Sequence, residues 1–512
     1  YTHRGNYLHS MRQLQADVAG LTHRDSVLTM VPMFHANAWG LPFSVPAVGG
    51  KLVFPGTVSG GEALARLIHE ENVTVGVGVP TVWLGLMDHL DEAGGDVPTL
   101  ERIMVGGSAM PPALIQALAR GFRDDRLPPF NIYYMHGSEA FGEHLLTEEL
   151  SGRFTPRCLF LSGHDRKAIN ALSNKRWVEF VPAAFHHVGR LLTEQIEPDC
   201  FMVTVSPMDR HGYFSLGTNA DYGASVIRKA KRVIVEVNKH MPRTFGECSV
   251  HISEIDALIE HDAPLGELAE AEASETDWAI ARQVAEYIED GDTLQMGVGG
   301  VPAAVLKLLE NHNNLGLHSE LFCPSMVSLI AKGVINGRKK RLMQHKHVYT
   351  LALGDKAMYD FMDDNPSIVG YPASWVNNPS VIRENSQMVS VNSAIEVDIT
   401  GQINAETIKG TPFSGTGGQL DFVRGAFAAR GGRSFIALHS TAKKGSLSRI
   451  VPSLTGTVTD TRMDAHYVVT EFGCVNLKGL SLSQRAKALI GIAHPHFREE
   501  LQTQARTMGL IS

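Results

Sequence analysis

The sequence has few cysteines, no long apolar run and no excess of positive charge. Five of its 512 residues are cysteine, scattered at positions 158, 200, 248, 323 and 474. An odd number without paired or metal-ligand spacing argues against a disulfide framework or a zinc site, and favours a reducing cytoplasmic compartment. No apolar stretch reaches the roughly 18 residues of a membrane-spanning helix. We recognise no signal peptide either, so we expect no membrane partner.

The charge balance also excludes some classes of partner. The chain has 46 basic and 54 acidic residues, a formal net charge of −8, which argues against nucleic-acid binding. Hydrophobic residues make up 44% and charged residues 20%, as in ordinary globular proteins. Histidines 186 and 187 are adjacent and lack partners at ligand spacing, so we expect no metal. The length predicts two to four domains.

One segment predicts a strand, a glycine turn, a helix and a second strand. A short apolar strand at Thr293–Met296 runs into a glycine-rich turn at 297–300, and the helix that follows has a proline in its first turn. The second strand, Leu315–His318, presents Glu320 at its carboxyl end, the edge where open α/β sheets bind ligands. Because glycines and a helix N-terminus favour developing negative charge, a carboxylate there indicates acyl transfer.

A dinucleotide-binding fold is the main alternative from the pattern alone. That motif requires a third glycine where this chain has Pro302, although Glu320 lies at about the distance of its ribose-binding acid. Purely structural glycines are a second alternative. The 297–302 pattern by itself leaves all three interpretations open.

Ten further motifs resemble the acetyl-CoA hydrolase/transferase family, and most closely its 4-hydroxybutyrate CoA-transferase branch. They run in order from about residue 130 to the C-terminus, about three-quarters of the chain. They are FVPAAFHHV (180–188), VSPMDRHGYFSLG (205–217), VEVNKHMPRTFG (235–246), MGVGGVPAAVL (296–306), LGLHSELF (315–322), VNNPSVI (376–382), FSGTGGQLDFVRGA (413–426), SRIVP (448–452), DAHYVVTEFG (464–473) and AHPHF (493–497).

This resemblance implies roles for specific residues. Glu320 of the H-S-E stretch would be the covalent nucleophile. Coenzyme A would be a substrate, with no separate cofactor, and the carboxylate substrates would be short-chain acids. The residues expected to contact coenzyme A are Gly297, Val298, Gly299, Gly300, Val301, Asn392, Gly417, Gly418 and Lys443.

The first 129 residues resemble the middle of an AMP-forming acyl-CoA synthetase. The motifs are VPMFHANAWG (31–40), GVPTVWLGLMDHL (78–90) and LERIMVGGSAMPPALI (100–115). The resemblance places His35 and Trp39 at an acyl pocket, and Gly106, Gly107 and Ala109 at a nucleotide-side turn. The phosphate-cradling loop and the C-terminal catalytic domain of that family are not found, so we expect a truncated fragment without ligase activity.

Composition and resemblance together predict a truncated fragment followed by two open parallel-sheet α/β domains with the active site between them. We expect the synthetase-like fragment at 1–129 and a first transferase domain at 130–260, clipped at its start. An acidic linker at 259–277 and a second transferase domain at 275–512 follow. An inactive fusion product stays an alternative, and oligomeric state, including a homo-oligomer, is open.

Three further basic or titratable features lie near these motifs, and each has an expected role. The basic run at 337–347 is expected to be a solvated loop, with phosphate contact as the alternative. Lys443 and Lys444 follow a predicted strand and could contact phosphate. His318 is expected to be a pocket neighbour of Glu320 rather than a base, because it shares a strand face with Glu320.

The predicted chemistry is double-displacement transfer of coenzyme A through a glutamyl-CoA thioester on Glu320. Backbone N–H groups near Gly299, Gly300, Gly417 and Gly418 are the expected oxyanion donors. Attack by water in place of an acid would make the protein an acetyl-CoA hydrolase instead. Acetate, propionate, butyrate, 4-hydroxybutyrate and succinate all stay open as acyl groups.

Overall fold

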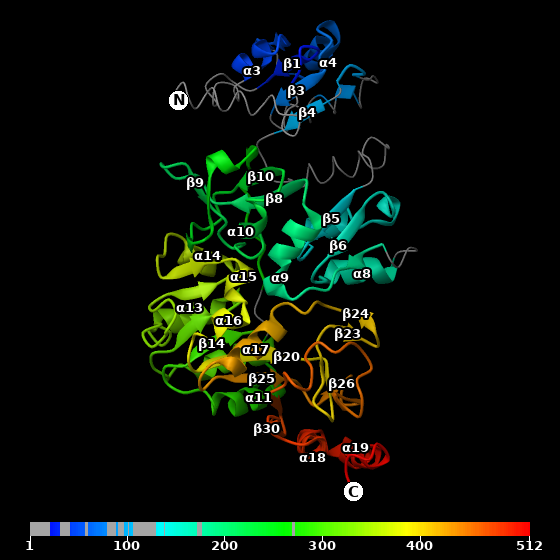
Figure 1. Cartoon of the computed structure of the whole chain (residues 1–512), viewed down its shortest axis with the longest axis vertical. Coiled ribbons are helices and arrows are strands. Elements are labelled where there is room, and N and C mark those ends of the chain that lie inside the picture. Colours follow the sequence, from blue (N-terminus) through cyan, green and yellow to red (C-terminus); the bar gives the residue numbers. More distant parts are fainter. Residues whose placement is uncertain are drawn as a thin grey trace.

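The computed structural model describes residues 21–30, 41–56, 60–78, 86, 89–90, 97–100, 102–105, 130–137, 139–171, 177–268 and 272–512. The N-terminal fragment forms a four-stranded parallel sheet in the order β2-β1-β3-β4, at the top of Figure 1. Its elements are β1 (Ser26–Thr29), α3 (Leu41–Ala47), β2 (Lys51–Val53), α4 (Gly61–Glu70), β3 (Val75–Gly78) and β4 (Arg102–Val105).

The next part of the chain contains two separate three-stranded parallel sheets, where the sequence indicated parallel pairing without distinguishing two sheets. The first contains β5 (Asn131–Tyr134), β6 (Thr155–Cys158) and β7 (Glu179–Phe180), with α7 (Glu139–His144) and α8 (Gly163–Ala171). The second contains β8 (Cys200–Val205), β10 (Arg232–Val237) and β13 (Ala257–Glu260), with α9 (Phe185–Arg190), a π-helix (Leu191–Ile196) and α10 (Gly223–Val226). An antiparallel pair, β9 (Tyr213–Ser215) and β12 (Ser249–His251), completes it.

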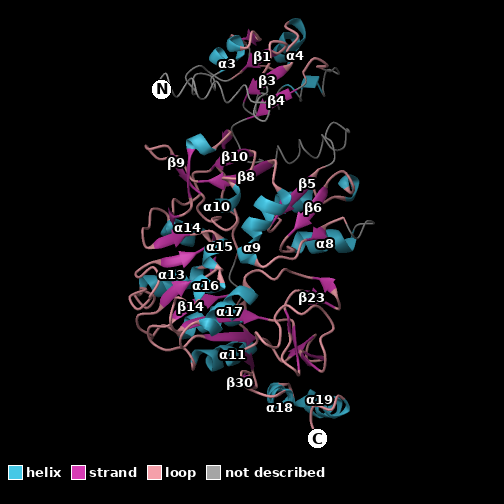
Figure 2. Ribbon diagram, viewed as in Figure 1, coloured by secondary structure: helices cyan, strands magenta, loops and turns pink. Residues whose placement is uncertain are grey.

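A nine-stranded sheet dominates the C-terminal part, in the order β11-β19-β17-β15-β14-β20-β25-β29-β30. All its pairings are parallel except β29–β30. Figure 2 shows its strands among flanking helices. The strands are β11 (Phe245–Gly246), β14 (Thr293–Met296), β15 (Gly316–His318), β17 (His347–Tyr349), β19 (Ile368–Gly370), β20 (Met388–Ser393), β25 (Arg433–Ala437), β29 (Tyr467–Thr470) and β30 (Gly473–Asn476).

The central strands are apolar because helices cover both faces of the sheet. β14, β15, β17 and β19 are buried along their whole length, as expected for parallel strands covered on two sides. The helices are α11 (Glu275–Ala285), α12 (Gly300–Leu308), α13 (Pro324–Ala331), α14 (Lys356–Met362), α15 (Ala373–Val376), α16 (Pro379–Ile382), α17 (Gln419–Ala428), α18 (Leu482–Ile492) and α19 (Pro495–Thr507). Capping boxes at Ser274 and Ser481 fix where α11 and α18 begin.

Short strands outside the main sheet carry the loops around the site. β21 (Glu396–Asp398), β22 (Ile403–Asn404) and β28 (Ile450–Val451) form one small sheet. Besides the β9–β12 pair, three pairs of short strands complete the described fold. They are β16 (Leu321–Phe322) with β18 (Leu351–Ala352), β23 (Thr407–Ile408) with β24 (Thr411–Pro412), and β26 (Thr441–Ala442) with β27 (Leu447–Ser448). Among the described residues, no helix has the length and apolar character needed to cross a bilayer.

The acidic linker is anchored to both sides rather than free. Asn238 donates a side-chain hydrogen bond to the Ala263 carbonyl at 2.7 Å, and Tyr359 donates to the Gly266 carbonyl at 2.7 Å. Leu265 packs against the main core of the C-terminal part. These contacts hold the two transferase parts together at one end.

Candidate active site

Four adjacent strands of the large sheet end at the same edge, and each is followed by predicted site residues. β15, β14, β20 and β25 are parallel neighbours, so their carboxyl ends lie together. Glu320 follows β15, the glycine turn 297–301 follows β14, Asn392 lies at the end of β20, and Lys443 comes after β25. This is the edge at which open α/β sheets bind ligands.

Glu320 is the central group of this edge. Its Oε2 accepts a 2.5 Å hydrogen bond from Asn377 Nδ2. Burial raises the pKa of its carboxyl group to about 7; the hydrogen bonds from Asn377 and the Gly418 backbone lower it, and the charges of Asp421 and Asp221 raise it. The residue nevertheless keeps part of its surface exposed. Glu320 is therefore a strongly perturbed carboxyl group that solvent or substrate can still reach.

The predicted glycine loop at 414–418 lies directly on Glu320. A Cβ atom on Gly418 would overlap Glu320 Oε2 and Asn377 Nδ2, and one on Gly417 would lie 3.4 Å from Glu320 Oε1. Gly417 also has a φ of +53°, a conformation that favours glycine. Glycine is needed at Gly418 because a side chain would occupy the space of the carboxylate, and at Gly417 because of its backbone conformation.

Residues of the N-terminal transferase part form the other wall. A Cβ on Gly415 would lie 2.6 Å from the Leu159 carbonyl oxygen, and the ring of Phe160 lies 3.6 Å from where a Cβ on Gly417 would stand. Phe160 is half-buried. The site therefore lies between the two transferase parts, as the resemblance implied.

Two buried acids accept hydrogen bonds from residues on either side of the Gly417–Gly418 turn. Glu406 Oε2 accepts a 2.6 Å hydrogen bond from the Thr416 hydroxyl, and Asp460 Oδ2 accepts one of 2.7 Å from Gln419 Nε2. Burial raises the pKa of Asp460 to about 7. These side chains fix both ends of the Gly417–Gly418 turn.

Asn377 is positioned by the strand that carries Glu320. It follows α15, and its backbone N–H bonds to the Ala373 carbonyl at 3.0 Å. His318 Nε2 donates to the Val376 carbonyl at 2.8 Å, and burial lowers the pKa of His318 to about 3. A neutral imidazole committed to that carbonyl positions Asn377 and does not act as a base.

The glycine turn after β14 has two different roles. Gly299 has a φ of +130° at the start of α12, and a Cβ there would meet nothing nearer than Pro302 Cδ at 4.0 Å. Val298 beside it is 64% exposed. A Cβ on Gly300, in contrast, would lie 2.7 Å from Asp277 Oδ2. Gly299 borders open space, whereas Gly300 is a packing requirement against a carboxylate, which makes it a weaker candidate oxyanion donor.

Asn392 lies behind this turn. It exchanges two amide hydrogen bonds with Gln295, at 3.0 and 3.1 Å. A Cβ on Gly297 would lie 3.3 Å from Asn392 Oδ1. The structure thus brings Asn392 and Gly297 together. Val298 is exposed beside them, whereas Val301 is buried in the main core of the C-terminal part.

The two basic features lie at different places: Lys443 comes after β25, whereas the 337–347 run leads into β17 and lies at the amino ends of the strands. Lys443 is exposed in the turn between β26 and β27, with a φ of +47°. The 337–347 run is only partly a solvated loop: Lys340 is 3% exposed, and its Nζ donates to the Leu317 and Lys346 carbonyls at 2.7 and 2.8 Å. Burial lowers the pKa of Lys340 to about 7. Lys340 packs beneath β15 and is unsuited to bind phosphate.

Three neighbours of Glu320 had no assigned role in the sequence: Asn377, Asp421 and Phe160. Asn377 and Asp421 fall within the VNNPSVI and FSGTGGQLDFVRGA motifs, so their positions carried a signal. Their contacts with Glu320 depend on tertiary folding. Phe160 lies outside the quoted motifs, and nothing in its sequence environment marked it.

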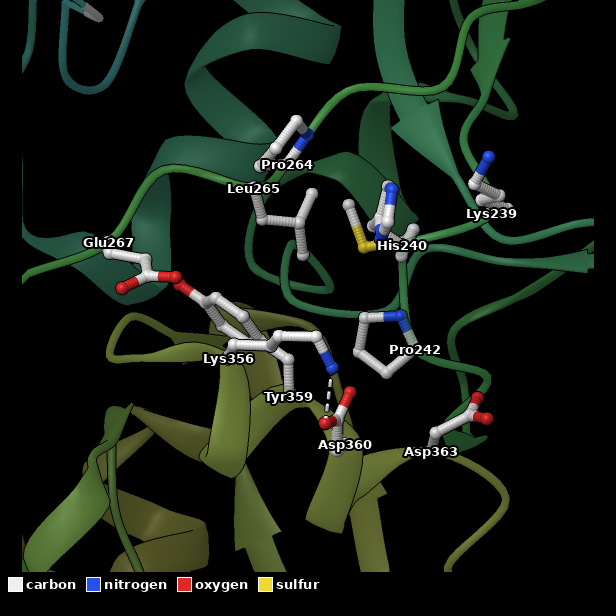
Figure 3. A pocket seen from close by; sticks show the side chains of 11 residues that line it. Lys239, His240, Pro242, Pro264, Leu265, Glu267, Lys356, Tyr359, Asp360 and Asp363 are labelled. Atoms are coloured by element: carbon white, nitrogen blue, oxygen red, sulfur yellow. Dashed lines mark hydrogen bonds and ion pairs between the residues drawn. The ribbon is translucent and has the colours of Figure 1, made fainter.

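A separate pocket of about 270 Å³, drawn in Figure 3, is not this site. It lies between residues 239–242 and 264–267 on one side and helix α14 on the other. Its lysines are already neutralised: Lys239 pairs with Asp262 at 2.8 Å and Lys356 with Asp360 at 2.5 Å. None of the groups around Glu320 lines it.

Five residues predicted for the synthetase-like fragment cannot be compared with the structure. His35, Trp39, Gly106, Gly107 and Ala109 lie outside the described residues. Within the part of the chain that is described, no cluster of three or more His, Cys, Asp or Glu residues could hold a metal ion.

Known families match the chain in three segments. The acetyl-CoA hydrolase/transferase N-terminal domain matches residues 86–267, and the C-terminal domain of the same family matches 354–505. The AMP-binding enzyme family matches residues 1–135. The resemblances seen in the motifs are confirmed for both parts.

Individual relatives match the same two parts of the chain, the transferase part and the N-terminal fragment. The 4-hydroxybutyrate coenzyme A transferase of Clostridium kluyveri is 44% identical over 71% of this chain and 85% of that protein. The structure of RipA from Yersinia pestis matches with a TM-score of 0.76 at 44% identity, covering 79% of this chain and 93% of that one. A medium-chain-fatty-acid–CoA ligase of Ectopseudomonas oleovorans is 46% identical over 23% of this chain, but only 21% of that protein.

Proposed function

Because the chain belongs to the acetyl-CoA hydrolase/transferase family, we propose that it moves coenzyme A from an acyl-CoA to a short-chain carboxylate through Glu320. The name of the Clostridium kluyveri relative supports a short acid, since it refers to a four-carbon hydroxy acid. The observation that carries the mechanism is the Glu320 carboxylate itself. It is partly exposed, perturbed towards neutrality and enclosed by Asn377 and two glycines.

In the first half-reaction the Glu320 carboxylate attacks the thioester carbonyl and the carbon–sulfur bond breaks. This gives a mixed anhydride and the coenzyme A thiolate. The thiolate then attacks the glutamyl carbonyl, the donor acid leaves as a carboxylate, and a glutamyl-CoA thioester remains. An acceptor carboxylate reverses these steps, so no separate cofactor is needed.

The electrostatics around Glu320 favour the covalent intermediate. Asp421 and Asp221 raise its pKa because they disfavour a third negative charge nearby. Acylation removes that charge, so the same repulsion stabilises neutral glutamyl-CoA relative to free carboxylate. Asn377 Nδ2 and the Gly418 N–H, which hold the carboxylate, are placed to hydrogen-bond the oxygen that becomes negative in each tetrahedral step.

Coenzyme A is assigned to the edge formed by Gly297–Val301, Asn392 and Lys443. Gly299 lets the thioester approach the start of α12, where backbone N–H groups and the helix dipole favour negative charge. Exposed Lys443, in the turn between β26 and β27 that comes after β25, is suited to a phosphate of the nucleotide end. We place the reaction in the cytoplasm, where the thiols of the five cysteines stay reduced.

Intact-protein mass spectrometry tests this function. Wild-type protein incubated with butyryl-CoA should gain the mass of coenzyme A minus water, and borohydride should abolish the adduct. E320Q keeps size and polarity but lacks the attacking charge, so transfer should fall at least about 10³-fold with coenzyme A affinity little changed.

Two outcomes would contradict the proposal: E320Q that forms the adduct, or wild-type protein that transfers coenzyme A without any adduct. Water in place of acetate serves as the acceptor control. If free acid forms at the same rate with and without acetate, the protein is a hydrolase.

A further inference from the structure

Helix α9 of the N-terminal transferase part contacts both elements that hold Glu320. It packs against α15, which ends at Asn377. It also reaches α17: the His186 backbone N–H donates to Asp421 Oδ2 at 3.1 Å, and His186 Nδ1 lies 2.7 Å from Asp421 Oδ1. Figure 1 labels α9 beside α15, with α17 close below them. One short helix thus braces the two sides of the carboxylate site.

Asp421 lies in the first turn of α17, three residues after Gly418. Its side chain is 3% exposed, and a carboxylate so buried is costly unless it is paired. Both of its oxygens are occupied by His186, so the pair fixes the orientation of the turn that carries Gly417 and Gly418.

The pair also bears on the charge of Glu320. Asp421 is one of two acids, with Asp221, whose charges act on Glu320. The titratable groups that interact with Asp421 are His186 and His187 of α9, Glu320 after β15, and Arg424 of the same helix α17. His186 is the one that hydrogen-bonds the Asp421 carboxylate directly, through its backbone N–H and its ring.

We propose that His186 is a positioning residue for the reaction, acting through Asp421: its hydrogen bonds to both carboxylate oxygens fix the glycine turn against Glu320. This inference rests on the proposed function, with Glu320 as nucleophile. It assigns the two transferase parts a shared role, since the histidine and its aspartate come from different parts of the chain.

The pH profile of kcat/KM separates this role from a merely structural one. H186N places an amide donor near the position of Nδ1, so the plateau at high pH and the acidic limb should both be largely kept. H186A removes the side-chain donor, so the plateau should fall, and the limb should move up because Asp421 is then less well hydrogen-bonded beside Glu320. D421N removes the repelling charge and should move the limb down, and H186N/D421N should follow D421N.

H187N is the matched control, because His187 is the exposed neighbour whose ring centroid lies 3.8 Å from that of His186, and its side chain makes no hydrogen bond to Asp421 among those described. Its profile should match the wild type. Thermal melts report folding, and if D421N does not fold, H186A against H186N and H187N still decides the matter. An H186A profile equal to that of H187N, or a loss of plateau with an unmoved limb, would overturn the inference. Failure of the proposed function is distinguishable, because then the wild type itself forms no adduct.

Discussion

Replacing Gly418 with alanine tests the geometry around Glu320 with a single methyl group. Gly418 has φ −96° and ψ 10°, which alanine adopts without strain, so backbone conformation does not confound the result. The new Cβ would overlap Glu320 Oε2 and Asn377 Nδ2 and must separate them. The substitution therefore acts on the nucleophile and its hydrogen bond.

The size of the effect follows from the bond that is lost. A hydrogen bond to a charged acceptor contributes about 1.5–3 kcal/mol. If that stabilisation is realised in the transition state, kcat should fall about 10- to 100-fold. Coenzyme A affinity should change much less, because most of the coenzyme contacts are expected on other strands.

Chromatographic detection of acetyl-CoA formed from butyryl-CoA and acetate measures the rate. G491A is the control: Gly491 lies within helix α18, and a Cβ there meets nothing within 4 Å. That variant should keep full activity and gain about 0.5–1 kcal/mol of stability. Folded G418A protein with a kcat within about threefold of wild type would refute the described contact between Gly418 and the carboxylate.

Further predictions concern titration, the amide donor and the coenzyme turn. The nucleophile is the anion and its pKa is about 7, so kcat/KM should rise about tenfold per pH unit below 7 and level off above 8. A raised folded-state pKa stabilises the protein at low pH, so the melting temperature of E320Q relative to wild type should increase as pH rises from 4.5 to 7. N377A should lower kcat about 10- to 100-fold, and N377D should lower it further because a carboxylate would repel Glu320. G299V should abolish turnover, since φ +130° excludes valine, while G509V, also at a positive φ (+69°) but near the C-terminus, should stay active. NADH should bind neither protein.

The local pattern around Glu320 could be predicted from the sequence. The strand at Thr293–Met296 has the predicted bounds, and the second strand is one residue shorter than predicted. Buried parallel strands are short apolar runs, and glycine and proline mark the turns between them. The position of a carboxylate at the end of such a strand can therefore be predicted from the sequence.

Strand continuity was harder to predict. The stretch at 386–398 is continuous and largely apolar, yet it forms β20 in the large sheet and β21 in a small one. No glycine or proline marks the change at Ala394 and Ile395. The chain leaves the large sheet there because Val397 pairs with the nearby β22 and with β28, which lies far along the sequence.

The contacts that give Glu320 its properties could not be predicted from spacing. His186 and Asp421 are 235 positions apart, and Asn377 is 57 positions from Glu320. Histidines 186 and 187 were considered only as metal ligands, because adjacent residues reveal nothing about a partner on another domain. Such pairs depend on how helices α9, α15 and α17 pack around one strand end.

This arrangement explains why a weak nucleophile can react at this position. A carboxylate is stabilised in water, and its reactivity rises when the protein replaces water with a few fixed donors. Here Asn377 and Gly418 supply those donors, while Asp421 and Asp221 disfavour the resting anion. Burial is the largest cause of the rise of the pKa to about 7, with the donors and the two acids acting in opposite directions on top of it. Much of the residue is therefore still ionised at neutral pH and ready to attack. Removing either kind of group should therefore change the pH limb in opposite directions, a pattern that a generally loosened site would not produce.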